Sequence, residues 1–284
     1  MFAKIKTGYR VVHAARKHCV NWHRLVLGAV TGSRGTFRSR AGGVISCDAK
    51  MLLRQLVRLE NVWQYHGDIL HVIRFENTSL VIHDYFGRDF RIPLNAEGVS
   101  PPSYFIKEYP FNVSGEVVLD VGAYLGDTPL MWLYRGAKEV IAIEPVPEHF
   151  EYLKKNVAGL PVVCIQASLA TPIPRIPRLI GSVSYGVKEA YETTDFLSTP
   201  TVDLTCLVDR YKPTVVKLDC EGCEHYVLEQ LSQIPTLGVK KIAVEFHDTK
   251  VTRAYESLVI LEGKLGRPVF TKKSIKKISA YWLL

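Results

Sequence analysis

The sequence lacks the features that mark a membrane-spanning or secreted protein. Its 284 residues include no run of about 18 apolar residues, the length that a transmembrane helix needs. The first residues also lack the uninterrupted apolar stretch of a secretory signal. Hydrophobic residues make up 47% of the chain and charged residues 23%, as in an ordinary globular domain. We therefore expect a cytoplasmic protein, with peripheral association at a membrane surface as an alternative.

Cysteines are few and scattered. Of the six, only Cys220 and Cys223 form a C-x-x-C pair, and no second pair has the spacing of a zinc site. We expect these two to pack as small buried side chains, and a redox pair is the alternative interpretation. The scattered thiols favour a reducing cytosol.

Acidic residues are missing from the first 47 positions. Nine basic residues lie there, whereas the rest of the chain holds 27 basic and 28 acidic residues, a net charge of −1. The overall charge of +8 is therefore a property of this segment. Apolar residues recur in it at steps of three and four, among them Val12, Ala15 and Cys19. We predict a basic amphipathic N-terminal arm, residues 1–47, in which a flexible connection at about 31–43 follows the helix.

Three interpretations of this arm are open. Its helix could pack its apolar face on the domain and leave a solvated basic face. It could bind a polyanion, either RNA phosphates or the headgroups of an anionic membrane surface. An acid-free amphipathic N-terminus is also typical of an organelle transit peptide.

Residues 48–108 predict a small α+β segment. A helix is expected over 51–65, and two alternating runs near 69–75 and 80–84 predict strands. A third strand is expected at 90–92. We predict an N-terminal helix and a small antiparallel sheet ahead of the main domain.

The stretch from Val117 to Glu144, VVLDVGAYLGDTPLMWLYRGAKEVIAIE, carries the strongest signal in the chain. It predicts a buried strand, a glycine turn, a helix and a second buried strand. Glycines at 122 and 126 allow a sharp turn and a close backbone approach to a ligand. Glu144 follows the second strand, about 20 residues past the turn, where a carboxylate can accept hydrogen bonds from ribose hydroxyls.

Two cofactor classes use this arrangement. A dinucleotide site would have G-x-G-x-x-G, so that a pyrophosphate rests on the helix N-terminus. This turn instead has Asp120 before it and Asp127 after it, which would repel a pyrophosphate but suit a ligand with an ammonium and a sulfonium group. It resembles the first motif of the S-adenosylmethionine-dependent methyltransferases.

A second segment, VVKLDCEGCE at 215–224, ends a strand with Lys217, Asp219 and Glu221. Because unpaired buried charge is costly, we expect these groups to be paired or to face a polar cleft. With the VEFH sequence at 244–247, the segment resembles the FkbM family of methyltransferases, whose corresponding sequence is usually K-I-D-[VI]-E-G-A-E. The resemblance extends from about residue 109 to 247.

The resemblance implies an α/β fold of the Rossmann-like class I type. We expect a mostly parallel seven-stranded sheet with helices on both faces over residues 109–284, and the preceding small sheet would cover one side of the substrate cleft. The exit of the third strand would lie beside the adenine, and 171–200 is a candidate substrate lid with a hairpin near 181–184. The candidate cofactor contacts are Asp120, Gly122, Ala123, Tyr124, Gly126, Asp127, Thr128, Glu144, Pro145, Gln166, Ala167, Ser168 and Asp219.

The strand ends also supply candidate catalytic residues, because they should converge on one cleft. His247 is the first candidate for general base, since imidazole titrates near neutrality, and Glu221 is the second. Lys217 could hold a carboxylate or polarise the acceptor oxygen, and Glu245 could position the substrate. The carboxylates and the histidine are compatible with a divalent metal, but nothing in their spacing is diagnostic, and we predict no metal ligand.

The chain is therefore predicted to transfer a methyl group from S-adenosylmethionine. The resemblance implies O-methylation of a hydroxyl on a sugar, another glycan or a small metabolite, by in-line displacement. Two alternatives remain: an RNA methyltransferase that uses the basic arm, and a cofactor-binding module without catalysis. The sequence does not predict an oligomeric state.

Overall fold

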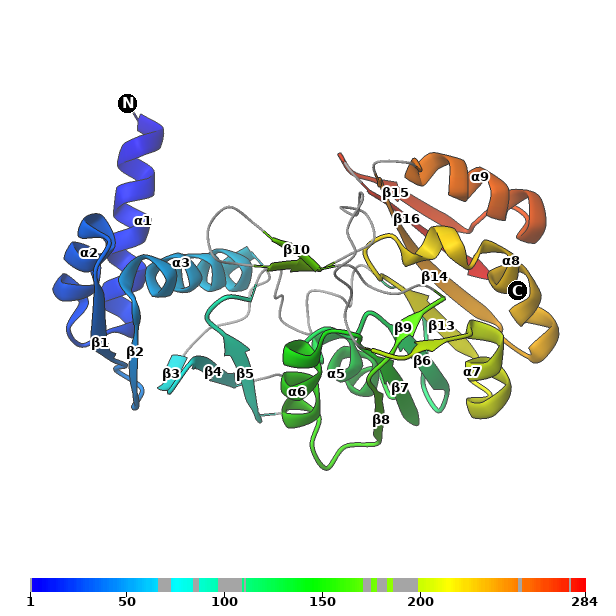
Figure 1. The fold of residues 1–284 in the computed structure, drawn as a ribbon, viewed down its shortest axis with the longest axis horizontal. Helices are drawn as coiled ribbons and strands as arrows, with labels where there is room; N and C mark the ends of the chain where they lie inside the picture. The colour runs from blue at the N-terminus through cyan, green and yellow to red at the C-terminus, as the bar shows by residue number, and fades with distance from the viewer. Residues whose placement is uncertain are drawn as a thin grey trace. The chain divides into compact units, whose positions relative to one another are not determined.

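The computed structural model describes residues 2–65, 73–83, 87–96, 109, 111–170, 175–177, 183–185, 199–249, 252–275 and 277–284. The chain forms two compact units, Met1–Glu108 and Tyr109–Leu284. No helix among the described residues is both long and apolar enough to cross a bilayer. Figure 1 labels the elements of both units.

The first unit combines three helices with two small antiparallel sheets. Its helices are α1 (Phe2–His18), α2 (Trp22–Thr31) and α3 (Ala49–Tyr65). A two-stranded sheet pairs β1 (Arg34–Arg38) with β2 (Val44–Asp48), and a three-stranded sheet consists of β3 (Ile73–Glu76), β4 (Ser79–His83) and β5 (Asp89–Pro93). The helix and the small sheet predicted for residues 48–108 are therefore present.

The predicted single amphipathic helix is wrong, because the chain turns between α1 and α2. Asn21 stabilises this turn through a long-range contact: its Nδ2 donates to the carbonyl of Thr36 at 2.9 Å, and its Oδ1 accepts from the amide of Arg38 at 3.0 Å. The predicted flexible connection at 31–43 is also wrong. Most of it belongs to the β1–β2 hairpin, which buries Phe37 and Ile45.

Residues 1–47 are not a separate arm. Helices α1 and α2 pack against each other and against α3, and Ala14, Ala15 and Leu25 are buried in this unit. Among the described side chains of α1, Arg10, Arg16 and Lys17 are exposed. This arrangement fits the first interpretation of the segment, a helix that packs its apolar face and leaves a solvated basic face.

The second unit contains the predicted seven-stranded, mostly parallel sheet. In sequence order its strands are β6 (Val117–Val121), β7 (Glu139–Ile143), β8 (Val162–Ile165), β13 (Val215–Leu218), β14 (Lys241–His247), β15 (Phe270–Lys273) and β16 (Lys277–Leu283). In space the order is β15-β16-β14-β13-β6-β7-β8, and only β16 runs antiparallel to its neighbours. The strand order therefore reverses between β6 and β13.

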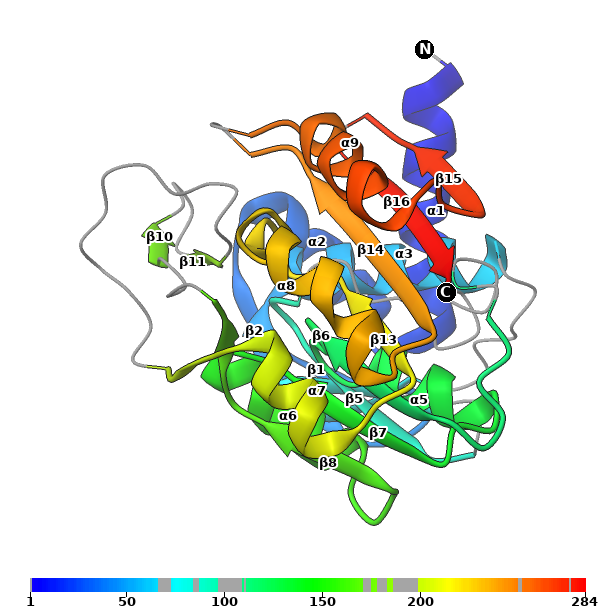
Figure 2. The ribbon, with the colours of Figure 1, turned by 90° about the vertical axis from the view of Figure 1, so that its right-hand side faces the viewer.

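Helices cover both faces of this sheet. They are α5 (Asp127–Tyr134), α6 (Pro147–Asn156), α7 (Leu204–Tyr211), α8 (Leu228–Gln233) and α9 (Ala254–Leu265), with short 3₁₀ turns η2 (Cys223–Tyr226) and η3 (Ile234–Leu237). Figure 2 shows α7, α8 and α9 on one face. Right-handed crossovers put α5 and α6 on the other face, because the chain moves across the sheet in the opposite direction there.

Smaller pairings complete the unit. Strand β9 (Ser168–Leu169) pairs in parallel with β12 (Thr201–Val202), and β10 (Arg175–Pro177) pairs with β11 (Val183–Tyr185). The predicted lid at 171–200 lies largely outside the described residues, as does the start of its hairpin at 181–182. The switch in strand order, with Lys217 in register with Asp120, is the place where α/β sheets of this kind bind ligands.

Candidate active site

The glycine turn that follows β6 is shaped by contacts within the protein. Gly122 has a φ of +80°, and a Cβ at this position would lie 1.8 Å from the carbonyl oxygen of Asp219. Gly126 has a φ of +98°, and its added Cβ would lie 3.1 Å from Val157 in the segment after α6. The sequence predicts a close approach of a ligand at both glycines. At Gly122 the close approach is instead between the end of β6 and the end of β13.

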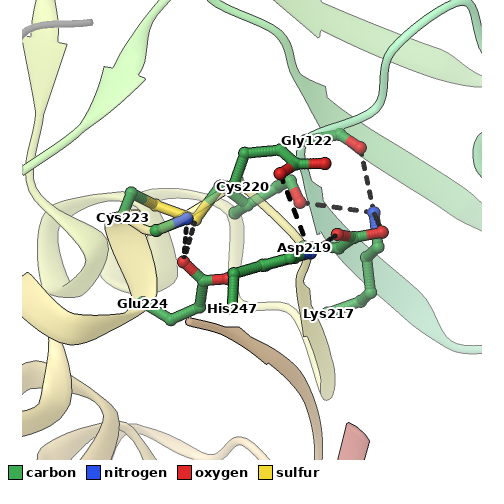
Figure 3. Close-up of a disulfide and its surroundings, with 10 residues drawn as sticks. Gly122, Lys217, Asp219, Cys220, Cys223, Glu224 and His247 are labelled. Carbon is green, nitrogen blue, oxygen red and sulfur yellow. Dashed lines mark hydrogen bonds and ion pairs between the residues drawn. A yellow bond between two sulfur atoms is a disulfide. The ribbon is translucent and has the colours of Figure 1, made fainter. Parts of the chain in front are cut away.

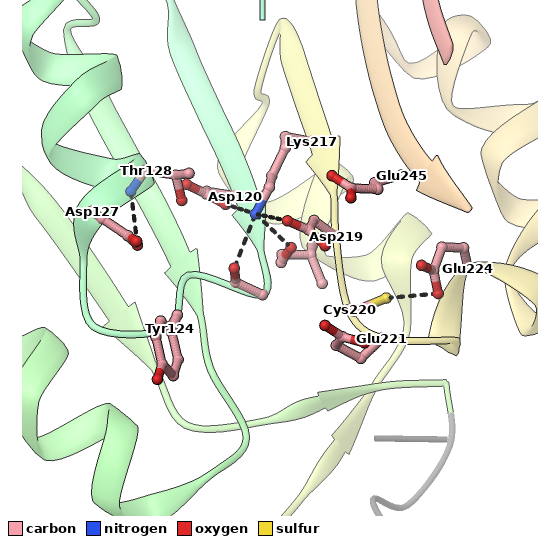
Figure 4. A network of polar contacts seen from close by, with 12 residues as sticks. Asp120, Tyr124, Asp127, Thr128, Lys217, Asp219, Cys220, Glu221, Glu224 and Glu245 are labelled. Atoms are coloured by element: carbon pink, nitrogen blue, oxygen red, sulfur yellow. Dashed lines mark hydrogen bonds and ion pairs between the residues drawn. The ribbon is translucent and has the colours of Figure 1, made fainter. Parts of the chain in front are cut away.

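Lys217 links the same two strand ends. Its Nζ lies 2.9 Å from Oδ1 of Asp120, in ion-pair range, and donates a hydrogen bond of 2.9 Å to the carbonyl of Gly122. The other oxygen of Asp120 accepts a hydrogen bond from Nε1 of Trp132 at 3.1 Å. Both charged side chains are fully buried. Lys217 therefore positions the glycine turn, a structural role that was not assigned to it from the sequence (Figure 4).

Burial sets the electrostatics around this ion pair. Desolvation raises the pKa of Asp120, although Lys217 opposes the shift. Desolvation alone would lower the pKa of Lys217, but the carboxylates of Asp120 and Asp219 raise it. Burial also raises the pKa of Asp127 to about 7, against the attraction of Lys217. The charge of Asp120 is therefore balanced inside the protein, so the expected attraction of a cationic ligand by Asp120 does not follow.

Glu144 lies at the carboxyl end of β7 as predicted, and backbone amides hold its carboxylate. Oε2 accepts from the amide of Tyr124 at 3.0 Å, and Oε1 accepts from the amide of Val146 at 2.9 Å. His149 Nδ1 lies 3.4 Å from Oε1. Tyr124 has a φ of +48°, which turns its amide toward this carboxylate. Each carboxylate oxygen has a second lone pair, so Glu144 can also accept hydrogen bonds from a ligand.

The remaining cofactor candidates lie beside β9 and β12. Ala167 and Ser168 are buried, and Ser168 Oγ lies 3.2 Å from Thr201 Oγ1, so these side chains face the protein. Gln166 is half-buried. The carbonyl of Pro145 accepts a hydrogen bond from Thr199 Oγ1 at 3.0 Å. Among these residues, Gln166 and Pro145 are partly exposed.

His247 lies at the end of β14 and is surrounded by carboxylates. Its Nδ1 lies 2.5 Å from Oε1 of Glu224, which is fully buried. Its Nε2 lies on the other side of the ring, 3.7 Å from Oδ1 of Asp219, 3.8 Å from Oε1 of Glu245 and 3.9 Å from Oε2 of Glu221. The structure therefore brings together three of the four predicted catalytic residues, and Lys217 is the exception.

Glu224 is the site residue that sequence reasoning missed. Besides its contact with His247, its Oε2 accepts a hydrogen bond from the amide of Gly222 at 2.6 Å. The signal was present, because Glu224 is the last residue of the family sequence K-I-D-[VI]-E-G-A-E. A second, partly buried contact supports the same strand end: His225 Nε2 lies 2.7 Å from the carbonyl of His247.

Cys220 and Cys223 form a disulfide, so the expectation of simple packing is wrong (Figure 3). Their Cα atoms lie 5.4 Å apart because Glu221 and Gly222 between them both have positive φ angles, which fold the backbone back on itself. The disulfide closes the loop between Asp219 and Glu224. It also removes these two thiols from the argument for a reducing cytosol, and a cytoplasmic location remains a prediction.

The strand order and the residues at the strand ends define a class. A sheet of this order, with a glycine turn after the first strand and a fixed carboxylate after the second, is the Rossmann-like class I methyltransferase fold. The profile of the methyltransferase FkbM domain matches residues 120–262 of the 284. The chain therefore belongs to the FkbM family and is an S-adenosylmethionine-dependent methyltransferase, as predicted.

Solved structures of other methyltransferases are also similar to this chain. The C-terminal domain of precorrin-6Y C5,15-methyltransferase from Rhodobacter capsulatus is 16% identical, with 66% of this chain and 90% of that chain covered and a TM-score of 0.40. A ribosomal protein L11 methylase from Lactobacillus delbrueckii subsp. bulgaricus is 15% identical over 63% and 74%, with a TM-score of 0.33. A Streptococcus pneumoniae protein in complex with S-adenosyl-L-methionine is 15% identical over 61% and 69%, with a TM-score of 0.40. At such identities and scores, none of them assigns an acceptor. No curated protein matches the chain.

The residues of the site fit S-adenosylmethionine. Glu144 has acceptor capacity for ribose hydroxyls, and Asp219 offers a partly exposed carboxylate to a cationic group. The hydroxyl oxygen of Thr128 is buried beside the Asp120 carboxylate. These groups would hold the cofactor, which supplies an electrophilic methyl group when bound.

Proposed function

We propose that this methyltransferase acts on a hydroxyl group of a sugar, another glycan or a small metabolite. Transfer to a hydroxyl needs an acceptor for its proton, whereas binding the cofactor does not. The observation that carries the proposal is the buried contact of 2.5 Å between Glu224 and His247 at the end of β14. A carboxylate that accepts a hydrogen bond from one ring nitrogen of a histidine fixes the orientation of the ring, and so of the other nitrogen.

The proton has two candidate acceptors in this cluster. When His247 is neutral and carries its proton on Nδ1, that nitrogen donates to Glu224, and the lone pair of Nε2 is directed toward Asp219 and Glu221. Glu221 is the most exposed of the surrounding carboxylates and is the second candidate. We do not assign this role to Lys217 or Glu245. Lys217 donates to the carbonyl of Gly122, and Glu245 forms an ion pair with Lys277.

A labelling experiment tests the acceptor class. Radiolabelled S-adenosylmethionine and the full chain are incubated with a cell extract, which is then separated into RNA, lipid, glycan, small-molecule and protein fractions. We expect label in the glycan or small-molecule fraction, and loss of that label with His247→Gln. The matched control is Glu229→Gln, which changes an exposed carboxylate of α8. Label in RNA or protein would overturn the proposal. Cofactor binding without label in any fraction would favour a module without catalysis.

RNA methylation is the second candidate function, because the first unit carries a basic surface. Exposed basic side chains from α1 and the segment after β1 line one hollow, together with Tyr9 and Val12: His13, Arg16, Lys17 and Arg40. Such a surface favours phosphate groups. Binding of the full chain to labelled RNA should then weaken steeply with salt and fall in an Arg16→Ala/Arg40→Ala variant. Binding to anionic vesicles but not to RNA would instead favour a peripheral membrane association.

A further inference from the structure

Three side chains at the ends of β13 and β14 direct their polar atoms at one another. The ligating atoms of Asp219, Glu245 and His247 all lie within 4.8 Å of one another. The separations of 3.7 and 3.8 Å from His247 Nε2 exceed the range of about 2.7–3.2 Å of a hydrogen bond. Two atoms that share one ion at about 2.0–2.3 Å lie roughly 3–4 Å apart. The two separations from His247 Nε2 are therefore those of ligands that share a cation.

A fourth residue, Glu224, orients the imidazole ring of His247. Glu224 is not one of the three residues above, yet its buried Oε1 lies 2.5 Å from Nδ1 of His247. A carboxylate on the second ring nitrogen is the usual neighbour of a metal-bound histidine, because it fixes the tautomer and raises the basicity of the ligating nitrogen. In His247 that nitrogen is Nε2, which faces Asp219 and Glu245.

The charges around His247 also call for a cation. Lys217, the nearest buried cation, lies 2.9 Å from Asp120 and 3.8 Å from Asp219, so two carboxylates share its charge. Glu245 Oε1 is buried and accepts no hydrogen bond from the described residues, and its cationic contact is with Lys277, a half-exposed lysine. Several carboxylates this close together repel one another unless a positive charge lies between them. A divalent ion would supply that charge better than one surface ammonium.

We propose that Asp219, Glu245 and His247 bind a divalent cation, Mn²⁺ in preference to Mg²⁺. Carboxylates suit both ions, but the imidazole favours the softer Mn²⁺, and Mg²⁺ demands a stricter octahedron of oxygen ligands. The use of this cation rests on the proposed function, because the acceptor hydroxyl would be its further ligand. The proton of that hydroxyl would pass to the Glu221 carboxylate, and the hydroxyl oxygen would use its electron pair to form the new bond to the methyl carbon. S-adenosylhomocysteine would leave with the electrons of the broken C–S bond, and His247 would be a ligand rather than the base.

Metal binding is measurable without any acceptor or cofactor. The full chain is treated with EDTA and desalted, and Mn²⁺ alone is titrated by calorimetry and by the electron paramagnetic resonance signal of the unbound ion. We expect one site per chain, with affinity lowered at least tenfold in Asp219→Asn and His247→Ala. Glu224→Gln should weaken binding about 10–100-fold although it supplies no ligand. Thermal unfolding verifies that each variant is folded.

Lys277→Met separates this proposal from a general attraction of cations to negative charge. Because Lys277 competes with the ion for Glu245, its removal should tighten Mn²⁺ binding about threefold or more. Lys264→Met, which removes a lysine paired with Glu229 on the surface, is the matched control and should leave the affinity unchanged. Equal tightening by both variants would overturn the site.

The possible results distinguish a failure of the cation site from a failure of the proposed acceptor class. Absence of Mn²⁺ binding, or binding that Asp219→Asn and His247→Ala do not weaken, overturns the cation site. If labelled methyl transfer to a hydroxyl acceptor then persists in EDTA, the proposed function stands alone. Mn²⁺ binding of the expected pattern together with label only in RNA or protein overturns the proposed acceptor and supports the cation site.

Discussion

Lys217 and His247 lie at the ends of adjacent strands, and carboxylates surround both, but the two clusters differ in how their charges are matched. Lys217 is fully buried and paired with Asp120, and it donates to the turn at Gly122. Among the described residues, His247 lies near four carboxylates, of which Asp219 is 3.8 Å from Lys217 and Glu245 pairs with the half-exposed Lys277; Asp219 and Glu221 are partly exposed. Burial alone therefore does not identify a catalytic group. A charge balanced within the protein indicates a positioning role, and an unbalanced cluster open to solvent indicates a ligand site.

The largest effect is expected from breaking the balanced cluster. Lys217→Met removes one partner of a buried ion pair and leaves Asp120 uncompensated, so the free energy of unfolding should fall by about 3–5 kcal/mol. Chemical denaturation measures the change. A Lys217→Met/Asp120→Leu double variant is the control and should recover much of the loss. A single variant as stable as the wild type would contradict the structural role of Lys217.

Substitution in the unbalanced cluster should affect turnover more than stability. His247→Gln should lower the rate of methyl transfer about 10²–10³-fold, since it removes either a base or a metal ligand. The free energy of unfolding should change by less than about 2 kcal/mol, because the glutamine amide can still donate to Glu224. Steady-state kinetics and denaturation on the same samples make the comparison. Turnover at the wild-type level would exclude both roles for His247.

Asp127 is a further buried carboxylate near the Lys217–Asp120 ion pair, and it should make the free energy of unfolding depend on pH. Its pKa is raised from 3.8 to about 7 by burial, so the folded state favours the protonated form. Its contribution to stability is full below about pH 4 and is lost as the pH rises to 7. We expect a loss of about 2–4 kcal/mol over this window in the cofactor-free protein.

The variant Asp127→Asn isolates this contribution. It should flatten the pH dependence of the unfolding free energy between pH 4 and pH 7. Denaturant titrations at several pH values measure it, with Asp209→Asn on the surface as the control. If both variants retain the wild-type slope, Asp127 is not the group that titrates.

The smallest effect is expected at Glu144, whose carboxylate is held by amides rather than by a cation. Glu144→Gln keeps one acceptor oxygen, so the affinity for S-adenosylmethionine should fall about tenfold. Calorimetric titration of the cofactor measures this change. Mn²⁺ binding should be unaffected in the same variant. Unchanged cofactor affinity would remove Glu144 from the cofactor site.

The parallel sheet could be predicted because its strands are buried on both faces. Short apolar runs such as those around Leu119 and Ile141, bounded by turn-forming residues, are typical of strands buried on both faces. The carboxylates at the strand ends could be predicted for the same reason, since a parallel sheet brings these ends to one edge.

Features that depend on distant contacts could not be predicted from local patterns. The turn at Asn21 requires the carbonyl of Thr36 and the amide of Arg38. The partner of Glu224 is His247, 23 residues further along the chain. The roles of Lys217 and Gly122 likewise become clear only when β13 lies beside β6.

The close contact between Gly122 and the end of β13 should couple the binding of two ligands. The backbone of this residue rests against the carbonyl of Asp219, and Lys217 holds the same residue through its own carbonyl. A ligand that shifts the glycine turn must therefore also shift the strand end that carries Asp219. We expect the affinities for cofactor and for a ligand of the Asp219 cluster to be linked, so that each changes the other by the same factor.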